Sequence, residues 1–211
     1  MGEDLSAQFD MFEEAKSPIE VGGLKPDYDY FARAFSKADA DRYFHELKQE
    51  VDWRQEKIRL FGRHVSVPRL TAWYGDEGKN YTYSGIGMAA KPWIPSLLEI
   101  KGAVEKLAAI SFNSVLLNLY RDGNDSVAWH SDDEAELGDN PIIGSVSFGE
   151  VRRFSSRTKP GVEPVSRHEL ELAHGSCVVM KGRSQSLWQH QVPKTKRPSG
   201  ARINLTFRRI F

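Results

Sequence analysis

The chain has 211 residues, of which 40% are hydrophobic and 27% are charged, a composition typical of a globular protein with one domain. A single cysteine excludes an internal disulfide and a CxxC zinc site. No apolar run is long enough to cross a membrane. We therefore expect a cytoplasmic protein, or a nuclear one if the source is eukaryotic. The formal net charge of zero conceals a basic part: residues 151–211 carry thirteen Lys and Arg residues against three acids, which fits either a polyanionic partner or a solvated face.

The order of the expected elements is helices first and strands afterwards. Residues 1–26 combine acidic residues with Gly and Pro, and we expect a mostly disordered leader. Ser36 is a candidate N-cap for a helix over residues 37–51, and a second helix is expected after Pro95, beyond a β-rich stretch at 56–90. From residue 112 onward the pattern predicts strands at 114–120, 142–148, 151–157, 176–180 and 201–209. This order predicts an α+β fold with an antiparallel sandwich or barrel as its C-terminal body.

Two of the expected strands carry a polar face. Side chains alternate across a strand, so the last strand places four polar residues on one side and apolar residues on the other. The earlier strand 114–120 similarly places Asn118 and Tyr120 on one side. Such a face either contacts solvent or lines an anion pocket in which arginines grip a carboxylate. The four residues of the last strand are Arg202, Asn204, Thr206 and Arg208.

A histidine and a carboxylate two residues apart provide the first candidate metal ligands. His130 and Asp132 can reach one metal from a strand end or loop, and His190 is a candidate third ligand. Two histidines and one carboxylate on one face of an octahedron form the triad of non-haem Fe(II) oxygenases, whose open positions take a 2-oxo acid and then O₂. The far carboxylate of a 2-oxo acid needs a cationic anchor, which Arg202 and Arg208 provide shortly after His190.

An ordered set of motifs over about residues 54–211 resembles the AlkB family of Fe(II)/2-oxoglutarate nucleic-acid dealkylases. The upstream motifs are most similar to the subgroup of homologues 2 and 3, which repairs alkylated bases. The matching segments are 66–69, 74–76, 81–85, 118–125, 130–134, 145–149, 173–176, His190 and 202–208.

The resemblance implies a double-stranded β-helix, or jelly-roll, core at 112–211 with N-terminal helices and a nucleotide-recognition lid at 56–90, within one dioxygenase domain at 27–211. It also implies that Fe(II) and 2-oxoglutarate are the cofactors. The metal ligands would be His130, Asp132 and His190; the 2-oxoglutarate-binding residues would be Asn118, Tyr120, Arg202, Asn204, Thr206 and Arg208. Loss of Arg208 is then expected to raise the 2-oxoglutarate requirement and to change iron affinity little.

The resemblance further implies how a flipped base is held. Tyr83 would stack on the base, while Tyr81, Asp133 and Glu134 would face its edge, where carboxylates favour cationic methylated bases. Asp133 and Glu134 can alternatively be solvated loop charges. Two further residues, Phe61 and Arg69, would bind substrate. Phe61 would be a wedge inserted into duplex DNA, or else a buried strand aromatic.

We therefore predict oxidative demethylation of N1-methyladenine- and N3-methylcytosine-type bases in DNA by a monomeric dioxygenase. The alternatives are the same chemistry on RNA or a protein side chain, and a nucleic-acid-binding module without catalysis. Within the leader, Gln8-Phe9-Asp10-Met11-Phe12 resembles a sliding-clamp-binding pentapeptide, so a clamp is a further candidate partner.

Overall fold

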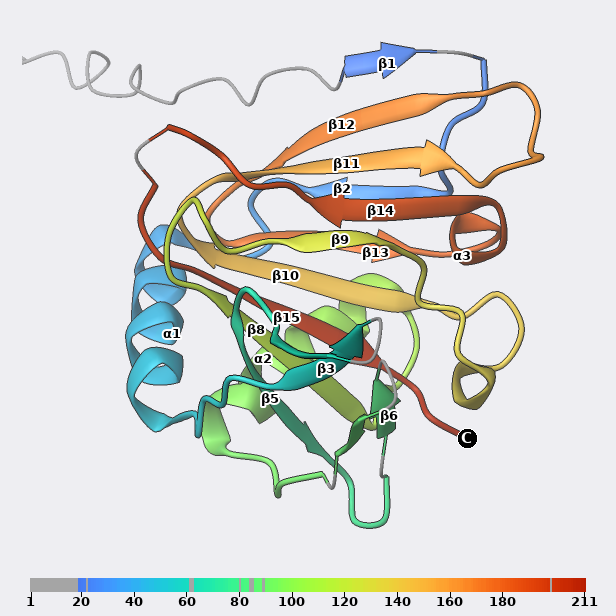
Figure 1. Cartoon of the computed structure of the whole chain (residues 1–211). Coiled ribbons are helices and arrows are strands. Elements are labelled where there is room, and N and C mark those ends of the chain that lie inside the picture. Colours follow the sequence, from blue (N-terminus) through green and yellow to red (C-terminus); the bar gives the residue numbers. More distant parts are fainter. Residues whose placement is uncertain are drawn as a thin grey trace, which may run out of the picture.

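Two antiparallel β-sheets face one another in the computed structural model of the chain (Figure 1). The structure describes residues 19–21, 23–60, 63–79, 81–83, 86–88, 90–197 and 199–211. One sheet has the strand order β1 (Ile19–Val21), β12 (Arg167–Leu172), β11 (Arg152–Thr158), β14 (Trp188–Val192) and β9 (Val127–His130). The other has the order β2 (Tyr28–Phe31), β13 (Ser176–Met180), β10 (Ile143–Gly149), β15 (Arg202–Arg208), β8 (Ser114–Tyr120) and β5 (Leu70–Gly75).

The alternation of side chains along the strands divides the core into two layers. Leu116 and Tyr120 of β8 face inward and pack with residues of the five-stranded sheet such as Phe154 and Leu170. The intervening residues of β8, among them Leu117, face outward and pack with the helices. The six-stranded sheet is therefore buried on both faces, and the space between the sheets is where a ligand can be enclosed.

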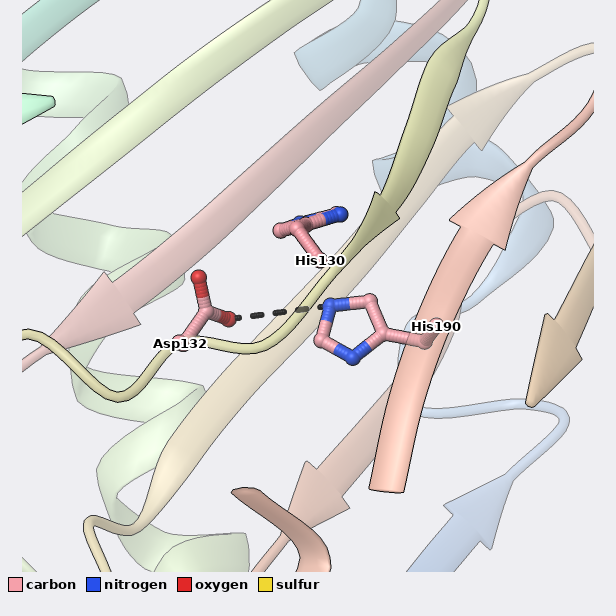
Figure 2. Close-up of side chains that lie close together, drawn as sticks. All are labelled: His130, Asp132 and His190. Carbon is pink, nitrogen blue, oxygen red and sulfur yellow. Dashed lines mark ion pairs between the residues drawn. The ribbon is translucent and has the colours of Figure 1, made fainter. Parts of the chain in front are cut away.

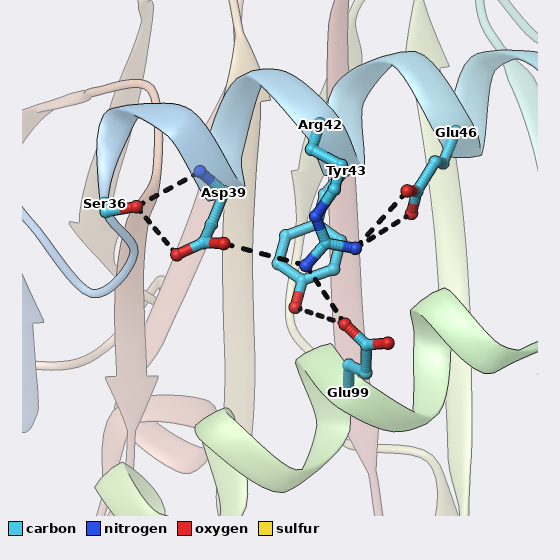
Figure 3. Close-up of polar contacts among 6 residues, drawn as sticks. All are labelled: Ser36, Asp39, Arg42, Tyr43, Glu46 and Glu99. Carbon is cyan, nitrogen blue, oxygen red and sulfur yellow. Dashed lines mark hydrogen bonds and ion pairs between the residues drawn. The ribbon is translucent and has the colours of Figure 1, made fainter.

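Helices α1 (Lys37–Glu50) and α2 (Pro95–Ala108) cover the outer face of the six-stranded sheet. Ser36 caps α1, as the sequence predicts, by accepting a hydrogen bond of 3.1 Å from the backbone N–H of Asp39. Glu99 on α2 accepts hydrogen bonds from Tyr43 and Arg42 of α1, at 2.9 and 3.1 Å, and so links the helices (Figure 3). None of the described helices is long and apolar enough to cross a membrane.

The predicted α+β, jelly-roll organisation is confirmed, although four of the five strands of the five-stranded sheet were not expected. Strands 114–120 and 176–180 occur as predicted, and the other three predicted strands occur within two residues of their expected ends. The strands β1, β9, β12 and β14 were not predicted. In β12 and β14 buried positions alternate with less buried ones, but His168 and His190 occupy buried positions, so the hydrophobic alternation is weak. The short β9 ends directly at the metal-ligand motif.

Two expected segment boundaries differ from the observed arrangement. The range 56–90 contains two small hairpins, β3 (Lys57–Leu60) with β4 (Arg63–Ser66) and β6 (Tyr81–Tyr83) with β7 (Ile86–Met88). It also contains β5, which pairs along its whole length with β8 and is therefore part of the core. The expected leader 1–26 contains β1, which pairs with β12 because edge strands retain unpaired backbone groups. The remaining short elements are the helix α3 (Ser184–Leu187) and a 3₁₀ turn at Ala135–Leu137.

Candidate metal centre and cosubstrate pocket

Three residues from adjoining segments converge at the edge of the five-stranded sheet. His130 ends β9 and lies opposite His190 of β14, and Asp132 follows two residues after His130 (Figure 2). One potential ligand atom from each residue lies within 4.8 Å of the others. His190 Nε2 is 3.8 Å from Asp132 Oδ2, and the two imidazole rings have centroids 4.3 Å apart. The residues that the sequence predicted as a triad therefore form a cluster that could hold one metal ion.

The charge states of this cluster suit a divalent metal. Burial alone would raise the pKa of Asp132, but Arg208 and the two histidines lower it to about 2. Burial and the neighbouring His130 lower the pKa of His190 to about 3. His130 Nδ1 donates to the Ala128 carbonyl at 2.8 Å, which leaves Nε2 as its lone-pair nitrogen. At neutral pH the cluster thus offers an ionised carboxylate from Asp132 and a neutral imidazole from His190, the forms that bind metal.

Arg208 contacts the metal cluster directly. Its Nη2 donates to Asp132 Oδ1 at 2.5 Å, and both side chains are almost completely buried. This contact orients the carboxylate so that Oδ2 faces His190. The expectation that loss of Arg208 leaves metal affinity nearly unchanged is therefore revised, because the arginine also supports a candidate metal ligand.

The polar faces of β8 and β15 line one pocket between the sheets, next to the metal cluster. Their register pairs Arg202 with Tyr120 and Asn204 with Asn118, so the two faces predicted separately lie side by side. All of these residues are buried, which excludes the solvent-face alternative. Asn204 donates to Ser145 at 2.9 Å, and its Oδ1 accepts from Thr206 at 3.2 Å.

Arg202 lies at the far end of the β15 face as a buried cation, and part of its hydrogen-bonding capacity is not used by the described residues. Arg202 is 1% exposed, its Nη2 donates to Ser147 Oγ at 2.8 Å, and its guanidinium lies 5.1 Å from the Tyr120 ring centroid. Nε and Nη1 of Arg202 have no hydrogen-bond partner among the described residues. Burial lowers the pKa of Arg202 to about 10, so the group remains charged at neutral pH. Such a group fits the carboxylate of a bound 2-oxo acid.

The predicted substrate residues have different surroundings. Asp133 accepts from Lys159 Nζ at 2.8 Å and is exposed. Glu134 is half-buried, and its Oε2 is buried without a hydrogen-bond partner among the described residues. Tyr81 and Tyr83 lie on β6, where the structure describes the backbone. Phe61 and the segment Gln8–Phe12 lie outside the described residues.

Arg69, which the sequence predicts as a substrate-binding residue, lies in the wall of the pocket. It is 4% exposed and lines the pocket, where its Nε donates to Asn118 Oδ1 at 2.7 Å and its Nη1 to the Ser126 carbonyl at 3.3 Å. Arg69 immediately precedes β5, and the pairing of β5 with β8 carries its side chain inward. In that position it holds the side-chain amide of Asn118.

Several residues around the pocket were not expected from the sequence. Ser145 and Ser147 of β10 hold Asn204 and Arg202, and their alternation in a buried strand was a usable signal. Buried Arg152 donates to the carbonyls of Asp122, Asp125 and Pro193, which joins the loops after β8 and β14. Because Arg152 links segments that are distant in the sequence, its role cannot be recognised from the residues around it.

A jelly-roll with a His-X-Asp and distal His cluster beside buried arginines defines an oxygenase of the Fe(II)- and 2-oxoglutarate-dependent class. The family model described as 2OG-Fe(II) oxygenase superfamily matches residues 27–208. Mouse DNA oxidative demethylase ALKBH2 is 41% identical over 210 residues, covering 94% of this chain and 87% of the relative.

A second group of relatives is similarly close. Bovine alpha-ketoglutarate-dependent dioxygenase alkB homolog 3 is 46% identical over 180 residues, covering 82% of this chain and 62% of the relative. A solved structure of OsALKBH1 has a TM-score of 0.62 at 16% identity and covers 89% of this chain and 98% of that one, which shows the shared fold. The chain belongs to the AlkB family of the 2OG-Fe(II) oxygenase superfamily, in the subgroup of ALKBH2 and alkB homolog 3. The predicted family and its cofactors, Fe(II) and 2-oxoglutarate, are thereby confirmed.

Proposed function

We propose that this protein oxidatively demethylates N-alkylated bases of the N1-methyladenine and N3-methylcytosine type in DNA. The observation that carries the proposal is the pocket itself. Its lining includes the His130–Asp132–His190 cluster, and the β15 face that lines it ends at Arg202. Two donors of this buried guanidinium have no partner in the part of the chain that the structure describes. This arrangement accommodates a metal ion together with an elongated dianion. The relatives named DNA oxidative demethylase support DNA as the substrate.

The pocket residues divide the work of binding between them. His130, Asp132 and His190 would hold Fe(II), and Arg202 would bind the distal carboxylate of 2-oxoglutarate, with Tyr120 and Asn118 beside it. With O₂, the bound pair supplies the oxidising chemistry that hydroxylates an N-methyl group, which leaves as formaldehyde while 2-oxoglutarate becomes succinate and CO₂. Arg208 keeps Asp132 ionised and oriented, and the apolar residues of the inner core exclude water from the pocket.

Base recognition would use the carboxylates that follow the ligand Asp132. The buried Oε2 of Glu134, which has no partner within the described ranges, is a strong acceptor for an N–H group at the edge of a methylated base, and its charge favours a cationic lesion. Asp133 is already paired with Lys159, so we assign it the lesser part. Tyr83 would stack on the base and Tyr81 would contact its edge, within a lid formed by the two small hairpins.

The decisive experiment measures demethylation of matched single- and double-stranded methylated oligonucleotides with Fe(II) and 2-oxoglutarate supplied. His130→Ala, Asp132→Ala and His190→Ala should each abolish turnover, because the two remaining ligands cannot hold Fe(II) in a facial array. His45→Ala, at an exposed position on α1, is the matched control and should retain activity. Turnover of methylated RNA or of a peptide in place of DNA would support the alternative substrates. Full activity of a triad variant would remove that residue from the metal site.

The N-terminal segment supports a separate proposal, that Gln8–Phe12 recruits the protein to a sliding clamp while the protein itself acts as a monomer in the cytoplasm or nucleus. A short segment with apolar anchors docks weakly, which suits transient recruitment. A fluorescence titration of residues 1–20 with the cognate clamp tests this, with Gln8→Ala/Phe12→Ala as the control. Equal binding by both peptides would contradict recruitment, and a dimer in light scattering would contradict the monomer.

A further inference from the structure

The segment that carries the ligand Asp132 is attached, residue by residue, to the chain just before His190. Ser131 Oγ donates to the Trp188 carbonyl at 2.8 Å. The backbone N–H of Asp132 donates to Gln185 Oε1 at 2.9 Å. Asp133 accepts from Lys159, whose own N–H donates to the Leu187 carbonyl at 2.8 Å. The short stretch from α3 to β14 therefore supports Ser131 and Asp132 directly and Asp133 through Lys159.

The bond from Asp132 to Gln185 is the buried member of this set. Strand β9 ends at His130, so the ladder with β14 has ended before Asp132, whose N–H needs another acceptor. Asp132 and Gln185 are each 1% exposed, so water does not substitute. The amide of Gln185 supplies that acceptor from a separate element, α3.

The surroundings of Gln185 give it one strong hydrogen bond. Its Nε2 donates to the sulfur of Met180 at 3.4 Å, and a thioether is a weak acceptor. Burial of an amide with so little compensation is unfavourable compared with an apolar side chain of the same size. The bond to Asp132 is what an apolar residue at this position could not provide.

We propose that Gln185 is a positioning residue for the metal centre, holding the backbone of Asp132 so that the carboxylate meets the two histidines. This inference rests on the proposed role of His130, Asp132 and His190 as metal ligands. Arg208 fixes Oδ1 of the same carboxylate, so Gln185 and Arg208 together hold it from both ends. Outer-shell partners of this kind typically contribute about 10- to 100-fold to metal affinity.

The test compares Gln185→Met, which keeps the length of the side chain and removes the acceptor, with Gln191→Met. Gln191 lies one residue beyond His190, and alternation along β14 directs its side chain away from the cluster. The full-length proteins are titrated with Mn(II) by electron paramagnetic resonance and with Co(II) by visible absorption. We expect Gln185→Met to weaken Mn(II) binding about 10- to 100-fold and to alter the spectrum of the Co(II)-saturated protein, and Gln191→Met to match the wild type.

A third variant separates the hydrogen bond from packing. Gln185→Glu keeps an acceptor oxygen on the same stem, and burial of the position favours its neutral carboxyl form. This variant should retain the wild-type Co(II) spectrum, and it tests the hydrogen bond even if Gln185→Met does not fold. The inference is overturned if Gln185→Met binds Mn(II) within twofold of the wild type, if Gln191→Met is equally impaired, or if Gln185→Glu loses the spectrum. Failure of the wild-type protein to bind Mn(II) or Co(II) at all would instead refute the proposed metal site.

Discussion

Substitution of Arg208 by methionine is expected to affect stability, metal binding and cosubstrate binding together. The change removes the partner of a carboxylate that is 1% exposed and leaves that charge without its nearest cation. Removal of one partner from a buried ion pair typically costs about 3–5 kcal/mol. For a protein of this size, 1 kcal/mol corresponds to about 2–4 °C, so the melting temperature of the metal-free protein should fall by about 6–20 °C.

The same substitution should alter both ligands of the pocket. Without the arginine, burial raises the pKa of Asp132, so protons compete with the metal and Mn(II) binding weakens as the pH is lowered. Loss of a charge-assisted hydrogen bond to the 2-oxo acid adds about 1.5–3 kcal/mol, or roughly 10- to 100-fold in 2-oxoglutarate affinity. Because an ion stabilises the folded protein more strongly the more tightly it binds, Mn(II) should raise the melting temperature of the variant less than that of the wild type.

Differential scanning fluorimetry with and without Mn(II), at several pH values, measures these effects. Arg209→Met is the control, since Arg209 is adjacent but exposed and lies over the ring of Phe211. Equal melting temperatures for the metal-free Arg208→Met and Arg209→Met proteins would refute the expected loss of stability. The reasoning also fails if Arg208→Met weakens 2-oxoglutarate binding while Mn(II) binding keeps its wild-type strength and pH dependence.

Three further predictions concern separate groups. Burial and His130 lower the pKa of His190 to about 3 in the folded metal-free protein, so the unfolded chain binds a proton that the folded chain does not. The free energy of unfolding should therefore fall as the pH drops below about 6.5. Urea unfolding at pH 7, 6 and 5 should show a smaller decrease of this free energy for His190→Gln than for the wild type. Burial raises the pKa of the Cys177 thiol to about 12, so a thiol reagent should react when the protein unfolds and not before; rapid labelling in native buffer would contradict this. Phe61→Ala should impair repair of duplexes more than of single strands, because a wedge offsets the unstacking that a duplex requires; an equal loss in both assays would indicate a core role.

The features predicted well from sequence are those that a strand or helix expresses locally. The period-two pattern at Arg202 to Arg208 fixes which side chains share a face, and Ser36 marks the start of α1, so both agree with the structure. What a pattern alone left undecided was whether the face is buried, because solvent and pocket faces are equally polar. The face is buried because the five-stranded sheet covers β8 and β15, with the pocket between the two sheets.

The features that were missed depend on contacts between distant segments. Arg69 precedes an edge strand by one residue, and nothing in its neighbourhood distinguishes a surface arginine from one drawn inward by the pairing of β5 with β8. Gln185 lies on a helix of four residues, and its partner is the backbone of Asp132, 53 positions earlier in the chain. Backbone acceptors and donors carry no sequence signature, so such bonds emerge from the fold.

Because β9 lies at the edge of its sheet, a bound metal would also hold this strand in place. Among the described strands β9 has one neighbour, β14, and their register shifts between His190 and Val192, so the ladder that holds it is short and irregular. An ion bound by His130 and Asp132 on one side and by His190 on the other would fasten the edge strand to the next one. Local opening of β9 should therefore slow when metal binds, and its amide protons should exchange with solvent much more slowly than before, while those of β10 and β15, at the centre of the other sheet, change little. In this protein the metal would stabilise the edge of the sheet in addition to taking part in the reaction.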